Sequence, residues 1–115
     1  MYDITYYFVW KTKGGVSILR GKVAMRVIQI IKEVCKEKNW SVISGKTAPS
    51  HVHLVLSSPG DASPAVIMRF IKGKSGYLLQ KEFQELRGGS WERGYFCKTL
   101  GDVQQQQIEE YLLNE

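Results

Sequence analysis

The apolar residues of this chain recur with two different periods, which predict alternating strands and helices. In the stretch His51–Ser57 apolar side chains occupy every second position, so they share one face of a strand while His51 and His53 share the other. From Lys22 to Lys38 apolar residues recur at steps of three and four, the period of an amphipathic helix that packs on a core. An apolar helix stripe can also bind a partner, but it is more often part of the core.

The same patterns predict five further elements along the chain. Strands are expected at Ile4–Trp10, Trp40–Gly45 and Trp91–Cys97, a helix begins after the Ser63-Pro64 pair, and a last helix covers Asp102–Glu115. The glycines at positions 73 and 76 weaken the middle of the second helix and favour a close neighbour there. The stretch 46–50 reads as a turn, which makes the two middle strands a hairpin.

The order of these elements before the last helix is β-α-β-β-α-β, which predicts an α+β fold. This is the ferredoxin-like split βαβ sandwich, a four-stranded antiparallel sheet with two helices on one face. The C-terminal helix, which carries Tyr111, is then available to cover the opposite face, where the histidines stand. With 115 residues, the chain is expected to form one domain, 1–115.

Composition adds a mild bias towards an anionic partner. Sixteen Lys and Arg residues against eleven Asp and Glu residues give a net charge of +5, which favours nucleic acid without proving it. Cys35 and Cys97 are far apart and outside any Cys-x-x-Cys pair, so we expect reduced thiols and no cysteine zinc site. Without a signal pattern or a membrane-length apolar run, a cytoplasmic location is expected.

The histidine pair is the first candidate for chemistry. His51 and His53 are two residues apart on one strand face, which places their Cα atoms about 6 to 7 Å apart. Both imidazole rings can therefore converge on one metal ion. A site that must also hold a phosphate oxygen needs few protein ligands and open coordination positions. The alternative is two histidines on a solvated strand face, and the pair alone does not decide between them.

Five blocks in order then resemble the single-tyrosine HUH transposases of the insertion-sequence 200/605 family, and together they cover nearly the whole chain. The blocks are the opening strand Tyr6–Lys13, His51-Val52-His53-Leu54, Ser63-Pro64 through Lys72-Gly73-Lys74-Ser75, Trp91-x-Arg93-Gly94-Tyr95-Phe96, and the terminal Tyr111. The resemblance implies a transposase that cuts and rejoins single-stranded DNA at hairpin-bearing ends of an insertion sequence. It also implies a divalent metal, Mg²⁺ or Mn²⁺, and a homodimer whose active sites are completed in trans.

The family pattern assigns the nucleophile to Tyr111, which would form a 5′-phosphotyrosine and release a 3′-hydroxyl. A phenol with a pKa near 10 is a poor nucleophile until it is positioned and its target phosphate is polarised. Among the five other tyrosines, Tyr6, Tyr7 and Tyr95 lie in expected strands, where packing explains them. One turn beyond Tyr111, Glu115 stands where the family usually has a glutamine at the metal site, so it is a candidate third ligand beside His51 and His53. A solvated terminal side chain is the alternative.

Basic residues in the matching blocks are the candidates for DNA contacts: Lys11, Lys13, Lys72, Lys74 and Arg93. A second class of function also fits the pattern, a non-catalytic protein that binds single-stranded nucleic-acid hairpins on the same fold. A relative that binds hairpins but has lost its chemistry lies between the two. Replication-initiator or relaxase types of HUH nuclease fit less well, because their catalytic domains are generally larger.

Overall fold

The first element, the strand β1, is the centre around which the rest of the chain is arranged. We use a computed structural model that describes residues 3–60 and 62–113. The strands and helices in chain order are β1 (Ile4–Lys11), α1 (Gly21–Lys38), β2 (Ser41–Ala48), β3 (His51–Ser58), α2 (Pro64–Glu82), β4 (Phe96–Leu100) and α3 (Asp102–Leu113). Short 3₁₀ turns at Lys13–Gly15 and Gln84–Leu86 lie in two of the connections.

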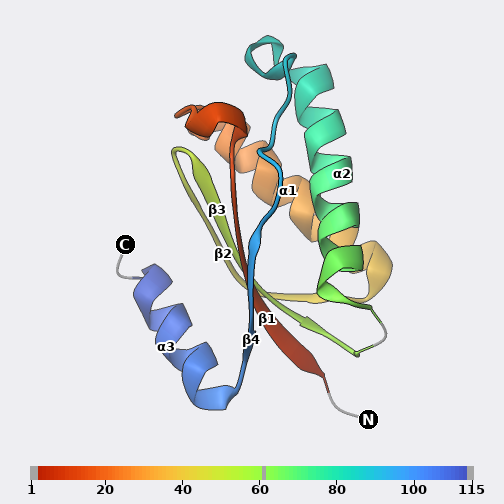
Figure 1. Cartoon of the computed structure of the whole chain (residues 1–115), viewed down its shortest axis with the longest axis vertical. Helices are drawn as coiled ribbons and strands as arrows, with labels where there is room; N and C mark the ends of the chain where they lie inside the picture. The colour runs from red at the N-terminus through yellow and green to blue at the C-terminus, as the bar shows by residue number, and fades with distance from the viewer. Residues whose placement is uncertain (1–2, 61, 114–115) are drawn as a thin grey trace.

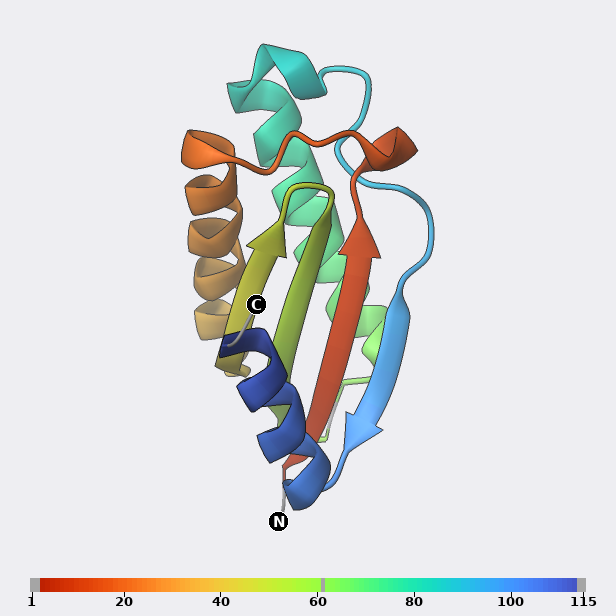
Figure 2. The same cartoon turned by 90° about the vertical axis from the view of Figure 1, so that its left-hand side faces the viewer.

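The four strands form one sheet in the order β2-β3-β1-β4, and every neighbouring pair is antiparallel. Strands β1 and β2 therefore run parallel to each other with β3 inserted between them, as do β3 and β4 with β1 inserted. Figures 1 and 2 show α1 and α2 together on one face of the sheet and α3 on the other. The predicted ferredoxin-like split βαβ fold, with the tyrosine helix on the opposite face, is confirmed.

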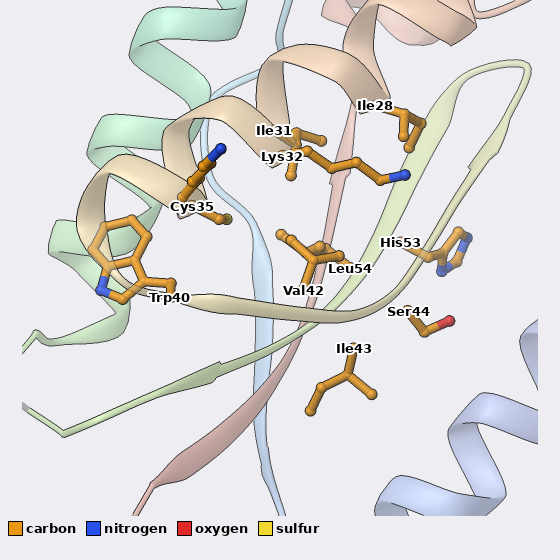
Figure 3. Close-up of a pocket in the computed structure, with 12 residues that line it drawn as sticks. Ile28, Ile31, Lys32, Cys35, Trp40, Val42, Ile43, Ser44, His53 and Leu54 are labelled. Carbon is orange, nitrogen blue, oxygen red and sulfur yellow. The ribbon is translucent and has the colours of Figure 1, made fainter.

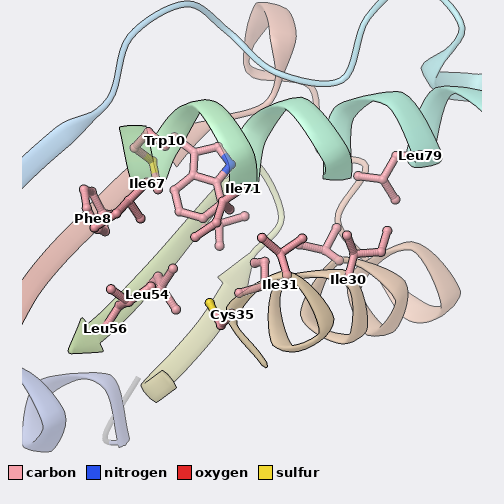
Figure 4. Packing of buried hydrophobic residues seen from close by; sticks show 14 of the residues in the cluster. Phe8, Trp10, Ile30, Ile31, Cys35, Leu54, Leu56, Ile67, Ile71 and Leu79 are labelled. Atoms are coloured by element: carbon pink, nitrogen blue, oxygen red, sulfur yellow. The ribbon is translucent and has the colours of Figure 1, made fainter. Parts of the chain in front are cut away.

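The main core lies between the sheet and the two long helices. Alternate residues of the central strands, including Phe8, Trp10 and Leu54, are almost fully buried against Ile31 of α1 and Ile71 of α2 (Figure 4). Full burial of each such side chain contributes about 1.5–3 kcal/mol, so this face fixes which side chains of β1 and β3 point towards the helices. The histidines are thereby directed to the other face.

Local signals explain the ends of the helices. Ser63 caps α2 by accepting a 3.2 Å hydrogen bond from the backbone N–H of Val66, and Pro64 takes the first helical position, as predicted. Asn39 ends α1 in the left-handed conformation, with φ of 60°. A 2.8 Å ion pair between Arg26 and Glu82 joins the two helices at their surface.

Gly76 allows α2 to approach the segment after it. A Cβ atom at this position would lie 3.2 Å from Cδ1 of Trp91, which is tighter than side chains usually tolerate. The indole N–H of Trp91 donates a 3.0 Å hydrogen bond to Ser75 Oγ on the same helix. The predicted close neighbour therefore exists at Gly76, whereas nothing lies within 4 Å of a Cβ atom at Gly73.

Two strand boundaries differ from the prediction. The segment 91–95 is not a strand: Trp91 forms an isolated bridge with Thr12, Gly94 has a φ of 81°, and β4 begins only at Phe96. Strand β2 continues to Ala48, so the predicted turn 46–50 shrinks to the two residues Pro49 and Ser50. This second difference matters most, because it places Lys46 inside the sheet.

The start of α3, the two cysteines and the lengths of the helices remain to be described. Asp102 is the first residue of α3 rather than its cap, and the carboxamide oxygen of Gln104 accepts a 3.2 Å hydrogen bond from the N–H of Gly101. Both cysteines are free thiols, and burial raises the pKa of the Cys35 thiol to about 12. Within the described ranges no helix is long and apolar enough to cross a membrane.

Candidate functional site

The sheet face opposite α1 and α2, which we call the open face, carries the candidate site. The strands direct these side chains to the open face: Tyr7, Val9 and Lys11 of β1, Ser44 and Lys46 of β2, His51, His53 and Val55 of β3, and Phe96, Lys98 and Leu100 of β4. No carboxylate belongs to this set, whereas three lysines do. The open face is therefore electropositive before any ion binds, which suits an anionic substrate.

The two histidines stand side by side, as the strand period predicted. Their ring centroids are 6.4 Å apart with an angle of 34° between the planes, and both side chains are half-buried. A ring centroid lies about 3 Å from an ion bonded to its nitrogen, so two imidazoles can share one ion up to a separation of about 6 Å. At 6.4 Å, His51 and His53 lie slightly beyond this separation, so one ring must turn for both imidazoles to bind the same ion.

Each imidazole is held by a hydrogen bond at Nδ1. The Tyr7 hydroxyl lies 2.8 Å from Nδ1 of His53, and the Ser50 hydroxyl lies 3.0 Å from Nδ1 of His51. Metal-binding histidines usually have such a partner on the ring nitrogen that does not bind the ion, because it fixes the tautomer and the ring orientation. With Nδ1 engaged in this way, each imidazole would bind an ion through Nε2, so the residues present fit a divalent cation.

The third predicted ligand, Glu115, lies outside the described residues. Across 3–60 and 62–113, no further His, Cys, Asp or Glu completes a cluster of three with the pair. Glu115 as a ligand therefore stays a prediction, supported by its spacing from Tyr111 and by its place in the family pattern.

Lysines flank the histidine pair on both sides. Lys11 of β1 lies directly across from His51, and Lys46 of β2 lies directly across from His53. Residues opposite each other on neighbouring strands have Cβ atoms about 5 Å apart, so both ammonium groups can reach the space above the imidazoles. Lys11 is exposed, and its ammonium makes no hydrogen bond or ion pair with any described residue.

Helix α3 brings Tyr111 to this face. Leu112 is buried in a small cluster with Tyr7, Val55 and Leu100, and Ile108 packs against the same cluster from one turn earlier. The Lys46 ammonium donates a 3.1 Å hydrogen bond to the carbonyl oxygen of Leu112. The carboxyl end of α3 is therefore anchored beside the strand pair that carries His53, while the Tyr111 side chain remains 55% exposed.

The predicted DNA-binding residues fall into separate places. Lys13, Lys72 and Arg93 line one groove of about 700 Å³ between α2 and the segment 89–93, which we call the basic groove. Lys11 shares a smaller hollow with Arg93 beside it. Lys74 lies apart from them, in a hollow with Glu33 and Glu37.

Both lysines of the basic groove donate hydrogen bonds to backbone carbonyl groups of the same chain. The Lys13 ammonium donates a 2.7 Å hydrogen bond to the Gly88 carbonyl, and the Lys72 ammonium donates 2.8 Å bonds to the carbonyls of Glu92 and Gly94. Burial lowers the pKa of Lys72, and the nearby carboxylate of Glu92 opposes that shift. These lysines therefore shape the loop, whereas Arg93 has no hydrogen bond or ion pair to a described residue and keeps its donors for a ligand.

Three residues of the site were missed from the sequence: Tyr7, Ser50 and Lys46. A two-residue Pro49–Ser50 turn would have fixed the hairpin register and placed Lys46 opposite His53, but this pair is not one of the usual turn signals. Tyr7 resembles the other strand aromatics, and only the register identifies the tyrosine that reaches His53.

Comparison with known proteins points in the same direction as the geometry. The family model for transposases described as IS200-like matches residues 1–115. The transposase for insertion sequence element IS200 of Salmonella typhimurium is 27% identical over 105 residues, which is 87% of this chain and 69% of that protein. The ISDra2 transposase TnpA of Deinococcus radiodurans is 25% identical over 117 residues, which is 97% of this chain and 84% of that one.

Solved structures share the fold. A crystal structure described as a transposase of Deinococcus radiodurans R1 superposes with a TM-score of 0.83 at 23% identity, covering 99% of this chain and 92% of that chain. The structure of a REP-associated tyrosine transposase bound to a REP hairpin superposes with a TM-score of 0.76 at 15% identity, covering 95% of this chain and 64% of that chain. At these identities the likeness concerns the fold alone.

Proposed function

The chain belongs to the family of IS200-like transposases, and from this premise we propose that it cleaves and rejoins single-stranded DNA at hairpin-bearing ends of an insertion sequence. Tyr111 is the proposed nucleophile, and the intermediate is a 5′-phosphotyrosine. One observation carries the proposal: the histidine pair and the tyrosine helix share the open face, and Lys46 joins the end of that helix to the strand beside His53.

The proposed cleavage is a transesterification. The phenolic oxygen of Tyr111 forms a bond to the phosphorus while the bond to the 3′ oxygen breaks, and a free 3′-hydroxyl leaves. Attack of a 3′-hydroxyl on the phosphotyrosine runs the same step backwards and joins two strands. Because one phosphodiester replaces another, rejoining requires no nucleotide cofactor.

His51 and His53 are the proposed ligands of a divalent ion, Mg²⁺ or Mn²⁺. Such an ion, when bound, would polarise a phosphate oxygen and neutralise charge that develops in the transition state. Tyr7 and Ser50 orient the two imidazoles through their Nδ1 atoms. Lys11, directly across from His51, adds a positive charge where a phosphate would lie.

We place the hairpin on the basic groove and the hollow beside it, with Lys11, Lys13, Lys72 and Arg93 as contacts and Lys74 as a more distant one. The REP-associated tyrosine transposase of similar fold binds a hairpin, which supports a hairpin ligand here. Arg93 is the residue expected to contribute most, because its guanidinium is not used internally by the described residues.

A homodimer with active sites completed in trans is part of the proposal. The sheet has free edges at β2 and β4, and α3 joins the rest of its chain through a small apolar cluster and the Lys46 hydrogen bond. So small an attachment is compatible with docking of α3 either on its own sheet or on that of a partner.

The proposal is tested by incubating the protein with labelled single-stranded DNA from the flanks of its own gene and Mn²⁺. We expect a covalent protein–DNA adduct that withstands denaturation, maps to Tyr111 by mass spectrometry, and disappears in Tyr111→Phe. Hairpin binding without any adduct would instead support the non-catalytic alternative.

A further inference from the structure

One further hollow, bordered by His53, has no role so far. It lies between α1 and the free edge of β2, has a volume of about 550 Å³, and is lined among others by Ile28, Lys32 and Cys35 of α1, Val42 and Ser44 of β2, and His53 of β3 (Figure 3). We call it the edge groove. His53 borders it, although its imidazole points to the open face, so the edge groove and the candidate metal site lie on opposite faces of the sheet beside the same edge strand.

Two features of β2 keep the edge groove open. The register between β2 and β3 shifts between Val42 and Ser44, which leaves an extra residue in the edge strand. Gly45 follows, and a Cβ atom there would lie 3.8 Å from Cδ1 of Ile28, in ordinary contact. A methyl group would therefore fit, but a larger side chain at position 45 would extend into the space between β2 and α1.

The charge of the edge groove is positive. Lys32 and Lys36 line it one helical turn apart, and no carboxylate of residues 3–60 and 62–113 does. Neither ammonium makes a hydrogen bond or ion pair to a residue in the described part of the chain. Lys36 also borders a hollow with Glu33 and Glu37, so Lys32 is the cation whose charge is least offset, and it extends towards the side on which His53 lies (Figure 3).

We propose that the edge groove binds a nucleotide of single-stranded DNA next to the phosphate that is cut. The base lies against the apolar side chains of Ile28 and Val42, and the adjoining phosphate lies on Lys32. Apolar walls and a flanking cation match the two parts of a nucleotide, and the volume lies in the range of about 300–1,000 Å³ that small-ligand sites occupy. This inference rests on the proposed function, since it assigns the scissile phosphate to the neighbourhood of His53.

The test measures the binding of a short fluorescent oligothymidylate by anisotropy, in chelator so that chemistry is absent. Gly45→Val fills the groove and should weaken binding at least tenfold. Thr47→Val is the matched control, because Thr47 faces α1 from the same strand but lines a neighbouring hollow. Lys32→Ala should weaken binding about threefold and reduce the slope of log affinity against log salt by about 0.7, the loss of one single-strand phosphate contact. Lys22→Ala, on the same helix outside the groove, should leave the slope unchanged.

Each alternative outcome contradicts the inference. Unchanged affinity of Gly45→Val for the oligonucleotide overturns the inference. If the affinity of this variant is unchanged but its mass by light scattering differs from that of the parent, a second copy of the chain covers the free edge of β2, and the inference is again wrong. If Gly45→Val fails to fold, equal salt slopes for Lys32→Ala and Lys22→Ala overturn it. Failure of the proposed function is distinguishable, because it shows as a missing Tyr111 adduct in the unaltered protein and leaves these binding comparisons intact.

Discussion

Lys46 donates a 3.1 Å hydrogen bond to the carbonyl oxygen of Leu112, and this contact joins the tyrosine helix to the strand pair that carries the histidines. The last carbonyl groups of a helix lack partners within the helix, and a cation there also interacts favourably with the helix dipole. The bond therefore orders the end of α3 one residue from Tyr111. Strand register puts the same lysine opposite His53, so one side chain links the proposed nucleophile to the proposed metal site.

Replacing Lys46 should slow the formation of the adduct. A hydrogen bond from a charged donor contributes about 1.5–3 kcal/mol, so Lys46→Met should lower the docked population of α3 and the adduct rate by about tenfold or more. Affinity for single-stranded DNA should change little, about twofold. Lys98→Met is the control, because it removes the same charge from the same face and the Lys98 ammonium makes no hydrogen bond to a described residue. Equal adduct rates in the two variants would contradict the anchoring role.

The fold could be predicted from the sequence because one face of β3 is apolar and the other carries the histidines. With Leu54 on one face and His53 on the other, only one orientation buries the apolar row, and the order of elements then limits the topology. Strand β1 carries large apolar side chains on both faces, so alternation alone did not identify Tyr7 as the residue that reaches His53.

The prediction of the last strand's boundaries was wrong for a different reason. Trp91 and Tyr95 have high strand propensity, but contacts with the rest of the chain override it. The Trp91 indole bonds Ser75 on α2, and the Lys72 ammonium takes the carbonyl oxygens of Glu92 and Gly94, so the segment 91–95 follows the helix before it joins the sheet at Phe96. Such contacts join residues about twenty positions apart and leave no periodic signal in the sequence.

Loss of either histidine should abolish cleavage without abolishing binding. His51→Ala or His53→Ala removes one of the proposed nitrogen ligands, and we expect adduct formation to fall by at least a hundredfold. Hairpin affinity should stay within about threefold, because backbone contacts spread over many residues determine it. Gel-shift and adduct assays on the same DNA measure both effects, with Ser57→Ala on the same strand face as control. Cleavage that persists in a chelator would rule out the metal.

Tyr7 should act on the metal through His53. Tyr7→Phe removes only the hydroxyl that holds Nδ1 of that imidazole, and loss of such a partner commonly weakens metal affinity about 10- to 100-fold. We expect a manganese titration of cleavage to shift to higher concentration, with activity recovered at saturating Mn²⁺. Tyr6→Phe is the matched control, since Tyr6 faces the main core on the other side of β1. A lowered maximum with an unshifted midpoint would show that the Tyr7 hydroxyl contributes elsewhere.

A mixture of two inactive variants tests whether α3 works in trans. In a dimer of His51→Ala with Tyr111→Phe, one site can combine intact histidines with an intact tyrosine only if the helix crosses between subunits. We therefore expect an equimolar mixture to regain cleavage after subunit exchange, up to about a quarter of the parental level, because about half of the dimers are mixed and each mixed dimer has one complete site of two. Either variant mixed with itself stays inactive. A monomeric mass by light scattering, or no recovery in mixtures proven to exchange, would contradict the trans arrangement and leave the cis contact between Lys46 and Leu112 as the working one.

Glu115 offers the last test, because it departs from the glutamine that the family pattern has at this place. Residues four apart on a helix share a face, so a continued α3 would direct Glu115 to the same side as Tyr111. A carboxylate binds Mg²⁺ or Mn²⁺ more strongly than an amide oxygen, while it adds negative charge beside the phosphate. Glu115→Gln should therefore keep activity with a higher metal requirement, and Glu115→Ala should lose most of it, as manganese titrations of adduct formation would show. Glu110→Ala, on the exposed side of the same helix, is the control. Should both Glu115 variants titrate like the parent, the ion would depend on His51 and His53 alone, with its remaining positions taken by water and the phosphate itself.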